Sequence, residues 1–400
     1  MIGAQNQVQR LQELRDNIDT IDLEILRLLE KRMRYSKEIG ALKKGSKVDI
    51  YQPQREEEVY RRLTSLSNGE LLSDGALRSI FSEIMSASRS VQESVLRSAD
   101  RGDNDFDQHT RYREGPLNGM PHDGQRIRIS IVGGKGQMGS LFKHFFEEKG
   151  HLVEVLGKED EPFFEERLKD SDIVIVSVPI NVTAEVIKKI GSCIKPESLL
   201  MDLTSIKTEP VKAMLSFSRC EVIGTHPLFG PKISSLKGQT VVLTPARGKS
   251  WLPWLLDIFG SAGIITTIST PERHDLLMAL TQCIRHLNTM ILSKLIREVG
   301  LDPQQIIKYS TPIFKAEIWW IGRLFSQDPA LYADLQMKNP ELTEILKLYS
   351  NAVDELVSMI SKKNREEFFK FFKASRQYFG SIQDTAVAKS DKLVDEIVKL

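Results

Sequence analysis

The first forty residues of the chain carry an apolar stripe with the period of an α-helix. Apolar side chains recur at alternating steps of three and four residues, at Leu11, Leu14, Ile18, Ile21, Ile25 and Leu28 and then at Tyr35, Ile39 and Leu42. This spacing predicts one helix over residues 8–42, roughly 50 Å long at 1.5 Å per residue. A stripe of that length must be covered, so we expect partner helices, and a second chain is one source of them.

Two shorter helices are expected after the first. A break at residues 44–46 precedes a helix that begins near Gln54, and a third helix is predicted over residues 73–95. The segment that follows is rich in Asp, Arg, Gly and Asn and has almost no aliphatic residues, which is typical of a linker. We therefore predict an all-helical domain over residues 1–96 and a linker over residues 97–126.

Beyond the linker, short β-branched runs alternate with helical stretches. Seven strands are predicted, over residues 127–132, 152–156, 172–178, 199–203, 221–225, 240–244 and 264–268. This alternation is typical of a doubly wound α/β sheet and predicts a Rossmann-type domain over residues 127–270. Residues 271–400 are predicted to be helical, with helix ends marked by Gly300, Pro303, Pro312 and Pro329. The predicted fold class is therefore multidomain, with an α/β domain between two all-α domains.

Composition limits the classes of partner. A chain of 400 residues, 41% of them hydrophobic, can bury two or three independent cores. Its 55 Lys and Arg nearly balance its 54 Asp and Glu, so the net charge favours neither nucleic acid nor an anionic membrane. Three widely separated cysteines predict neither a disulfide framework nor a zinc site, and we expect no metal. With no signal-peptide pattern and no long apolar run, we expect a cytoplasmic protein.

Polar residues interrupt the apolar stripes of the first and third helices. Arg32 occupies a stripe position of the first helix, where a guanidinium buried without a partner would cost several kcal/mol. Lys43 lies about three turns further along the same face, so the two cations could clamp a small dianion. Ser88 and Gln92 continue the stripe of the third helix and need hydrogen-bond partners. The alternative is that Arg32 pairs with a glutamate such as Glu56.

Residues 8–95 resemble the all-α chorismate mutases, through LRDNIDTIDLEILRLLEKR, KEIGALKK and the arginine and glutamate of YQPQREEEV. The resemblance implies the rearrangement of chorismate to prephenate, which requires positioning and electrostatic stabilisation and no cofactor. By this likeness Lys43 and Gln92 donate to the ether oxygen and Arg15 and Arg32 hold the carboxylates, while the remaining site residues are Arg55, Glu56 and Ser88. Gln52 departs from the family pattern, because some members have Asp there.

The positions of two of these arginines bear on the oligomeric state. Arg15 and Arg32 are about 25 Å apart along one helix and about 100° apart around it, so they cannot converge on one small ligand within a single chain. The resemblance implies that Arg15 reaches into the partner subunit's site. We therefore expect an intertwined homodimer.

A glycine-rich turn follows the first predicted strand. The segment GGKGQMG places Gly134, Gly136 and Gly139 as G-x-G-x-x-G between a strand and a helix, with Gln137 and Met138 at the helix start. Such glycines permit a tight turn and bring pyrophosphate close to the helix N–H groups, so the motif predicts a dinucleotide site. The alternative is a tight turn without a ligand.

The choice between the two nicotinamide cofactors depends on the end of the second predicted strand. The acidic residue expected there for the ribose comes slightly late, as Glu159 or Asp160. This acidity favours NAD, whereas Lys158 leaves NADP open.

Three further motifs, DIVIVSVPI, MDLTSIK and IGTHPLFGPK, end predicted strands. In open α/β sheets ligands bind beyond the carboxyl ends of the strands, so these ends should face one crevice. His226 is well placed there as a base, although a lone histidine is more often structural. His274 and His286 lie on the next predicted helix, and Arg323 lies in an apolar stretch where a cation needs an anion.

Residues 127–400 resemble the prephenate dehydrogenases that are fused to a mutase, through GGKGQMG, VSVPI, THPLFGP, ERHD and GRLFSQDPALYADL. The resemblance implies NAD-dependent oxidative decarboxylation of prephenate to 4-hydroxyphenylpyruvate, a step of tyrosine biosynthesis. By this likeness His226 accepts the proton of the ring hydroxyl, Ser205 orients that hydroxyl, Arg323 binds a carboxylate and His274 assists binding. Lys315, similar to an arginine of relatives, is a helper at most, and the helical tail supplies the dimer interface.

Two other functions fit parts of the pattern. A β-hydroxyacid type of Rossmann dehydrogenase fits the glycine turn, but it would use a lysine base and would not account for the first 96 residues. A non-catalytic, NAD-binding dimeric regulator would place leucine where Arg32 stands. The sequence decides neither tyrosine inhibition, nor transfer of prephenate between two sites, nor the choice between prephenate and arogenate.

Overall fold

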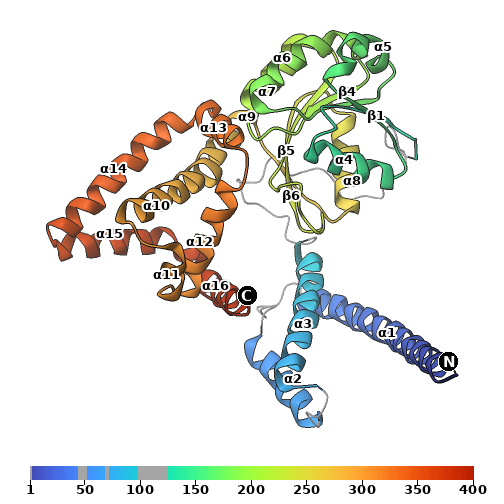
Figure 1. Cartoon of the computed structure of the whole chain (residues 1–400), viewed down its shortest axis with the longest axis vertical. Helices are drawn as coiled ribbons and strands as arrows, with labels where there is room; N and C mark the ends of the chain where they lie inside the picture. Colours follow the sequence, from blue (N-terminus) through green and yellow to red (C-terminus); the bar gives the residue numbers. More distant parts are fainter. Residues whose placement is uncertain (1, 44–51, 68–71, 98–123) are drawn as a thin grey trace. The chain divides into compact units, whose positions relative to one another are not determined.

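The computed structural model of the protein describes residues 2–43, 52–67, 72–97 and 124–400 (Figure 1). The chain divides into two compact units, Met1–Asp107 and Gln108–Leu400. The predicted break at residues 44–46 and nearly all of the predicted linker lie outside the described residues.

The described part of the first unit consists of the three predicted helices, α1 (Ile2–Lys43), α2 (Pro53–Leu66) and α3 (Asp74–Arg97). The C-terminal part of α1 packs against α3, where Leu77 and Met85 are buried. The apolar stripe of α1 from Leu11 to Leu28 is about half exposed, with values from 45% at Leu14 to 65% at Leu28. The described residues of this unit therefore leave most of the predicted stripe uncovered.

The second unit is built on a seven-stranded sheet in the order β2-β1-β3-β4-β5-β6-β7. All seven predicted strands are present, as β1 (Arg128–Val132), β2 (Leu152–Leu156), β3 (Ile173–Val176), β4 (Leu199–Asp202), β5 (Glu221–Pro227), β6 (Thr240–Arg247) and β7 (Ile265–Ile268). The strands from β2 to β5 are parallel. The chain changes direction along the sheet between β1 and β3, which is where ligands bind in doubly wound folds.

Two strands, β6 and β7, depart from the all-parallel arrangement of a simple doubly wound sheet. Strand β6 runs antiparallel to β5, and β7 runs parallel to β6. The reason is the connection, because residues 228–239 contain no helix that could carry the chain back across the sheet. The strand β5 also extends to Pro227, so His226 lies within the strand and pairs in register with Val242.

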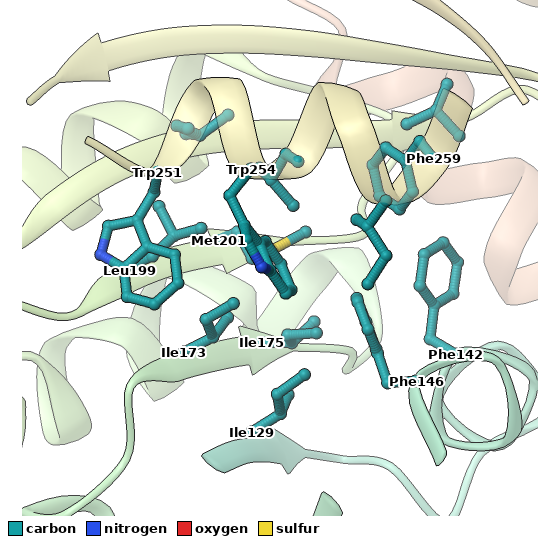
Figure 2. Close-up of a cluster of buried hydrophobic side chains, with 14 of the residues drawn as sticks. Ile129, Phe142, Phe146, Ile173, Ile175, Leu199, Met201, Trp251, Trp254 and Phe259 are labelled. Atoms are coloured by element: carbon teal, nitrogen blue, oxygen red, sulfur yellow. The ribbon is translucent and has the colours of Figure 1, made fainter. Parts of the chain in front are cut away.

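Helices cover both faces of the sheet. Aromatic side chains of α4 (Gln137–Glu148) and α8 (Trp251–Ser261) pack on one face against Ile129, Ile173, Ile175 and other strand residues, as Figure 2 shows. On the other face lie α5 (Phe164–Leu168), α6 (Ile180–Ile190) and α7 (Thr208–Phe217). The short helical turns η1 (Lys158–Phe163) and η2 (Gly191–Cys193) complete the connections. This burial on both faces accounts for the nearly continuous apolar runs of the parallel strands.

The remainder of the second unit is helical, as predicted. Its elements are α9 (Pro271–Met278), the π-helical turn η3 (Ala279–Ile284), α10 (Arg285–Val299), α11 (Pro303–Lys308), α12 (Pro312–Phe325), α13 (Pro329–Lys338), α14 (Leu342–Ser361), α15 (Arg365–Tyr378), η4 (Gly380–Ile382) and α16 (Gln383–Val398). The helix boundaries predicted from the glycine and the prolines are confirmed. Pro303, Pro312 and Pro329 each begin a helix after a capping Asp or Thr, and Gly300 ends α10 in the left-handed conformation.

Among the described helices, none combines the length and the apolarity that crossing a membrane requires.

Candidate active sites

The three helices of the first unit enclose a polar pocket of about 400 Å³. Helix α3 contributes Ser88 and Gln92, whose side chains are buried although both are polar. The full lining is Arg32, Ser36, Ile39, Lys43, Gln52, Arg55, Glu56, Val59, Arg62, Leu63, Phe81, Met85, Ser88, Arg89 and Gln92. The pocket thus brings together every residue that the sequence placed in one subunit's own N-terminal site.

The guanidinium of Arg32 is held by neutral partners. Its Nη1 donates to the Ser88 hydroxyl and, over 3.2 Å, to the backbone carbonyl of Ile84. Burial lowers the pKa of Arg32, and the carboxylate of Glu56 partly offsets this effect. Because neither hydrogen-bond partner carries a charge, the positive charge of Arg32 remains available to an anion in the pocket.

The glutamate of this pocket is paired with a different arginine from the one considered in the sequence. Glu56 on α2 forms an ion pair with Arg89 on α3, whereas the described contacts include no ion pair between Glu56 and Arg32. Arg89 was not predicted from the sequence, because it lies beside the stripe residue Ser88 and not in the stripe itself. A long cation adjacent to a buried hydroxyl was the available signal.

The remaining predicted residues of this site differ in exposure. Lys43 is half-buried at the end of α1, and the Oε1 atom of Gln92 is buried without a hydrogen-bond partner. An unpartnered buried amide oxygen marks a place that a ligand or water would satisfy. Arg55 is exposed and pairs with Glu58 over 2.9 Å. Arg15 is also exposed, on the uncovered part of α1.

Two glycines of the turn in the second unit differ in how closely other protein atoms surround them. A Cβ atom at Gly139 would lie 2.5 Å from the Cα atom of Gly134, so that position must lack a side chain for the loop to pack on the helix. At Gly136 the nearest protein atom would be 3.4 Å away, at the carbonyl of Gly133. The protein alone therefore does not exclude a side chain at Gly136, and close approach of a dinucleotide would account for a glycine there.

Helix α4 begins directly after this turn, with Gly136 as its capping residue and no side chain capping its first N–H groups. Gln137, Met138 and Gly139 form its first turn, where backbone N–H groups bind phosphate oxygens readily. The structure thus supports the predicted dinucleotide loop by two features, a glycine that the packing does not need and an uncapped helix start.

The two acidic residues after β2 have different surroundings. Glu159 forms an exposed ion pair with Lys135 of the glycine turn. Asp160 accepts the backbone N–H of Gly157 over 2.7 Å, and this bond lowers the pKa of Asp160, assisted by Arg167. Asp160 is therefore engaged in holding the turn, whereas Glu159 lies against the glycine loop where a ribose would be bound.

Two histidines and an aspartate form a buried chain of hydrogen bonds. Nδ1 of His226 lies 2.8 Å from Nε2 of His274, and Nδ1 of His274 lies 2.8 Å from Oδ1 of Asp275. His226 and His274 are 2% and 1% exposed. Asp275 also accepts the backbone N–H groups of Lys207 and Thr208, each over 2.8 Å. Strand β5 and helix α9 are joined by this chain.

The protonation states of His226 and His274 follow from Asp275, which accepts the hydrogen bond of His274. Burial alone would raise the pKa of Asp275, but hydrogen bonds from His274 and from residues 207 and 208 outweigh burial, and the pKa is lowered. The ionised carboxylate can only accept, so His274 carries its proton on Nδ1 and accepts through Nε2. His226 then donates through Nδ1, which leaves its Nε2 atom unprotonated and basic.

Burial also sets the basicity of His226. It lowers the pKa of His226 well below the ordinary histidine value, and the electrostatic interactions with His274 and with the Lys207 ammonium act in the same direction. His226 is therefore neutral, and able to accept a proton, across the neutral pH range.

A buried ion pair is connected to these hydrogen-bonded residues through the backbone of Lys207. Lys207 forms an ion pair with Asp202 and donates to the backbone carbonyl of Thr225 over 2.8 Å, and both charged side chains are fully buried. Burial lowers the pKa of Lys207, while Asp202 acts in the opposite direction. No role was predicted from the sequence for Asp202, Lys207 or Asp275, although they lie in the motifs MDLTSIK and ERHD.

The other predicted residues of the second unit are not joined to His226 by any hydrogen bond among the described residues. Ser205 is half-buried in the loop between β4 and α7, and Lys315 is half-buried on α12. Arg323, which the sequence places in an apolar stretch, is exposed on α12. Burial raises the pKa of Tyr332, and the Arg323 guanidinium partly offsets this effect. The ring of Tyr332 in turn lies 4.9 Å from that of His286.

A small apolar cluster brings three of the quoted motifs together. Ile180 follows the strand end VSVP, Ile206 lies in MDLTSIK, and Leu335 follows GRLFSQDPALYAD on α13, and these three side chains pack on one another. Helix α13 thus covers the carboxyl ends of β3 and β4, which is the expected side of the sheet for a ligand.

Comparisons with known proteins cover all three parts of the chain. The family models "Chorismate mutase type II", "Prephenate dehydrogenase, nucleotide-binding domain" and "Prephenate dehydrogenase, dimerization domain" match residues 14–93, 147–265 and 270–374. The T-protein of Enterobacter agglomerans is 31% identical over 97% of this chain and 98% of its own length. The T-protein of Haemophilus influenzae is 30% identical over 97% of each chain.

A solved structure supports the fold of the second unit. Prephenate dehydrogenase from A. aeolicus, in complex with hydroxyphenyl propionate and NAD+, has a TM-score of 0.53 at 19% identity and covers 64% of this chain and 99% of that one. The helical front end, the Rossmann-like sheet and the helical tail all have their counterparts among these relatives. The chain belongs to the family of bifunctional chorismate mutase/prephenate dehydrogenases of tyrosine biosynthesis.

Proposed function

We propose that the two activities of the chain use separate sets of residues, one in each unit. In this assignment residues 1–96 form the mutase domain, residues 127–270 the nucleotide-binding domain and residues 271–400 the substrate-binding and dimerisation domain. Residues 97–126 are the linker. The observation that carries the proposal is the pair of polar assemblies, the pocket around Arg32 and the chain from Asp275 to His226, which share no residue.

In the mutase site the protein has to hold a dianion and stabilise charge on the ether oxygen. Arg32 would bind one carboxylate, because its hydrogen bonds to Ser88 and Ile84 orient the guanidinium without neutralising it. Lys43 and Gln92 would donate to the ether oxygen as negative charge grows there. For Gln92 this assigns its side-chain N–H₂ to the ligand and its unpartnered Oε1 to another donor, such as water.

The uncovered stripe of α1 supports a homodimer. Leu14, Ile18 and Leu28 are about half exposed, and burying them against a second copy would remove an apolar patch from water. Arg15 lies on this part of α1 and would reach the partner subunit's pocket. The dimerisation model that matches residues 270–374 supports a second interface in the helical tail.

In the dehydrogenase site His226 would act as the general base. Its Nε2 atom would take the proton of the ring hydroxyl, and the resulting imidazolium would be stabilised through Nδ1 by His274 and Asp275. Ser205 would orient the hydroxyl, and Arg323 would bind a carboxylate of prephenate. A hydride would leave C4 of prephenate for the nicotinamide, and aromatisation of the ring would drive loss of the ring carboxylate as CO₂.

NAD is the cofactor that the glycine turn fits. Gly134, Gly136 and Gly139 would bring the pyrophosphate to the start of α4, at Gln137 and Met138, and Glu159 would bind the ribose. The nicotinamide supplies the hydride acceptor. The A. aeolicus prephenate dehydrogenase crystallised with NAD+ supports this choice.

The division into two sites predicts that Arg32→Ala removes the mutase activity alone. Chorismate turnover should fall by about 100-fold or more, because a charge that binds and stabilises the transition state is lost. Both rates are measured on one preparation, the mutase by chorismate absorbance without cofactor and the dehydrogenase by NADH from supplied prephenate. Equal loss of the two activities would indicate a shared site.

The role of His226 predicts a loss of about 10² to 10⁴ in dehydrogenase kcat for His226→Asn, the usual contribution of a general base. The affinity for NAD, measured by titration, should change little. Chorismate turnover by the same variant is the control for folding. A loss of about tenfold or less would assign His226 a structural role.

The lowered pKa of His226 predicts the pH dependence of the dehydrogenase. The base works in its neutral form, so lowering the pH removes activity only once the pH falls through the pKa of His226. As the pH is lowered, kcat/KM for prephenate should therefore remain constant through about pH 6.5, the ordinary pKa of histidine, and should decline only at a lower pH. Initial rates from about pH 5 to pH 9 test this, and an acid limb centred at or above the ordinary value would contradict it.

A further inference from the structure

Glu56 is the one acidic residue among the described residues that line the mutase pocket. Arg32, Lys43 and Arg55 line the same pocket, which the proposed function assigns to a dianion. A carboxylate in that place repels the ligand unless a cation compensates it. The pocket therefore contains a charge that works against its proposed ligand and whose compensation has to be explained.

Arg89 provides that compensation from helix α3. Its Nη1 atom donates to Oε1 of Glu56 on α2, and the two side chains are only 15% and 21% exposed. Arg89 directly follows Ser88, the hydroxyl that receives Arg32. The ion pair uses one oxygen of Glu56, so Oε2 can still accept a hydrogen bond from a ligand hydroxyl.

The same two helices carry a second arginine–glutamate ion pair, which lies in more exposed surroundings and has two hydrogen bonds. Arg78 on α3 binds Glu57 on α2 through both guanidinium Nη atoms, at 2.9 and 3.2 Å. Both side chains are 48% exposed, and neither lines the pocket. The chain thus offers a matched arginine–glutamate pair that links α2 to α3 without contact with the site.

We propose that Arg89 is a positioning residue of the mutase site, which holds the Glu56 carboxylate in place and cancels its repulsion of the dianionic substrate. The inference rests on the mutase function proposed above and adds a residue to it. Arg89 acts through Glu56 and is not required to touch the substrate.

The expected kinetic signature follows from the charge of the ligand. Chorismate carries two carboxylates both in the ground state and in the transition state, so an uncompensated Glu56 repels both to a similar extent. An effect shared by both states changes KM and leaves kcat nearly unaltered. A residue that merely stabilised the fold would lower the amount of active enzyme and leave KM unchanged.

The test compares Arg89→Met, Glu56→Gln and the double variant, with Arg78→Met as the matched control. Arg89→Met should raise KM for chorismate about tenfold or more and change kcat less than about threefold. In the double variant the neutral amide needs no compensation, so KM should equal that of Glu56→Gln within about threefold. Arg78→Met should leave KM unchanged. Prephenate oxidation by each variant reports that the rest of the chain is intact.

The outcomes separate this inference from the function on which it rests. Absence of chorismate turnover in the parent protein would defeat the proposed function itself. With an active parent, an unchanged KM in Arg89→Met, or additive effects of the two substitutions, would overturn the role of Arg89. If Arg89→Met loses helical content by circular dichroism, Arg89→Gln replaces it, because the amide still donates to Glu56 without charge and should raise KM in the same way.

Discussion

The dehydrogenase unit depends on one buried carboxylate, that of Asp275. It accepts hydrogen bonds from His274 and from the backbone of Lys207 and Thr208, and thereby fastens helix α9 to the start of α7. Its backbone carbonyl also accepts the side chain of Asn339, ahead of α14. A buried carboxylate with this many donors stays ionised, and its charge fixes the tautomers of two histidines in succession.

Both sites of the chain show the same physical device, a charge that is oriented by neutral groups or compensated by a charge outside the reaction. In the mutase pocket Arg32 is oriented by Ser88 and by a backbone carbonyl, so its charge remains for the ligand. In the dehydrogenase unit Lys207 forms an ion pair with Asp202. Together with burial, the positive charge of Lys207 lowers the pKa of His226. Burying a charge costs desolvation free energy, so buried charges of this kind are expected where they serve a function.

The sequence predicted those features that depend on a local pattern. The period of apolar residues located the three helices and the seven strands, and the polar positions Ser88 and Gln92 proved to be buried as expected. What it missed depends on contacts made by the fold. The direction of β6 is set by a connection without a helix, and the partners of Glu56 and Asp275 lie 33 and 68 positions away at Arg89 and Lys207. The exposure of Arg323 was likewise invisible to an argument from its apolar neighbours.

The role of the Asp275 carboxylate is tested by the rate of prephenate oxidation by Asp275→Asn. An amide can donate to His274, which would reverse the order of donors and leave the proton of His226 on the wrong nitrogen. We expect a loss of about 100-fold or more in dehydrogenase kcat, with chorismate turnover unchanged in the same preparation. Full dehydrogenase activity in this variant would contradict the proposal that the buried carboxylate sets the base.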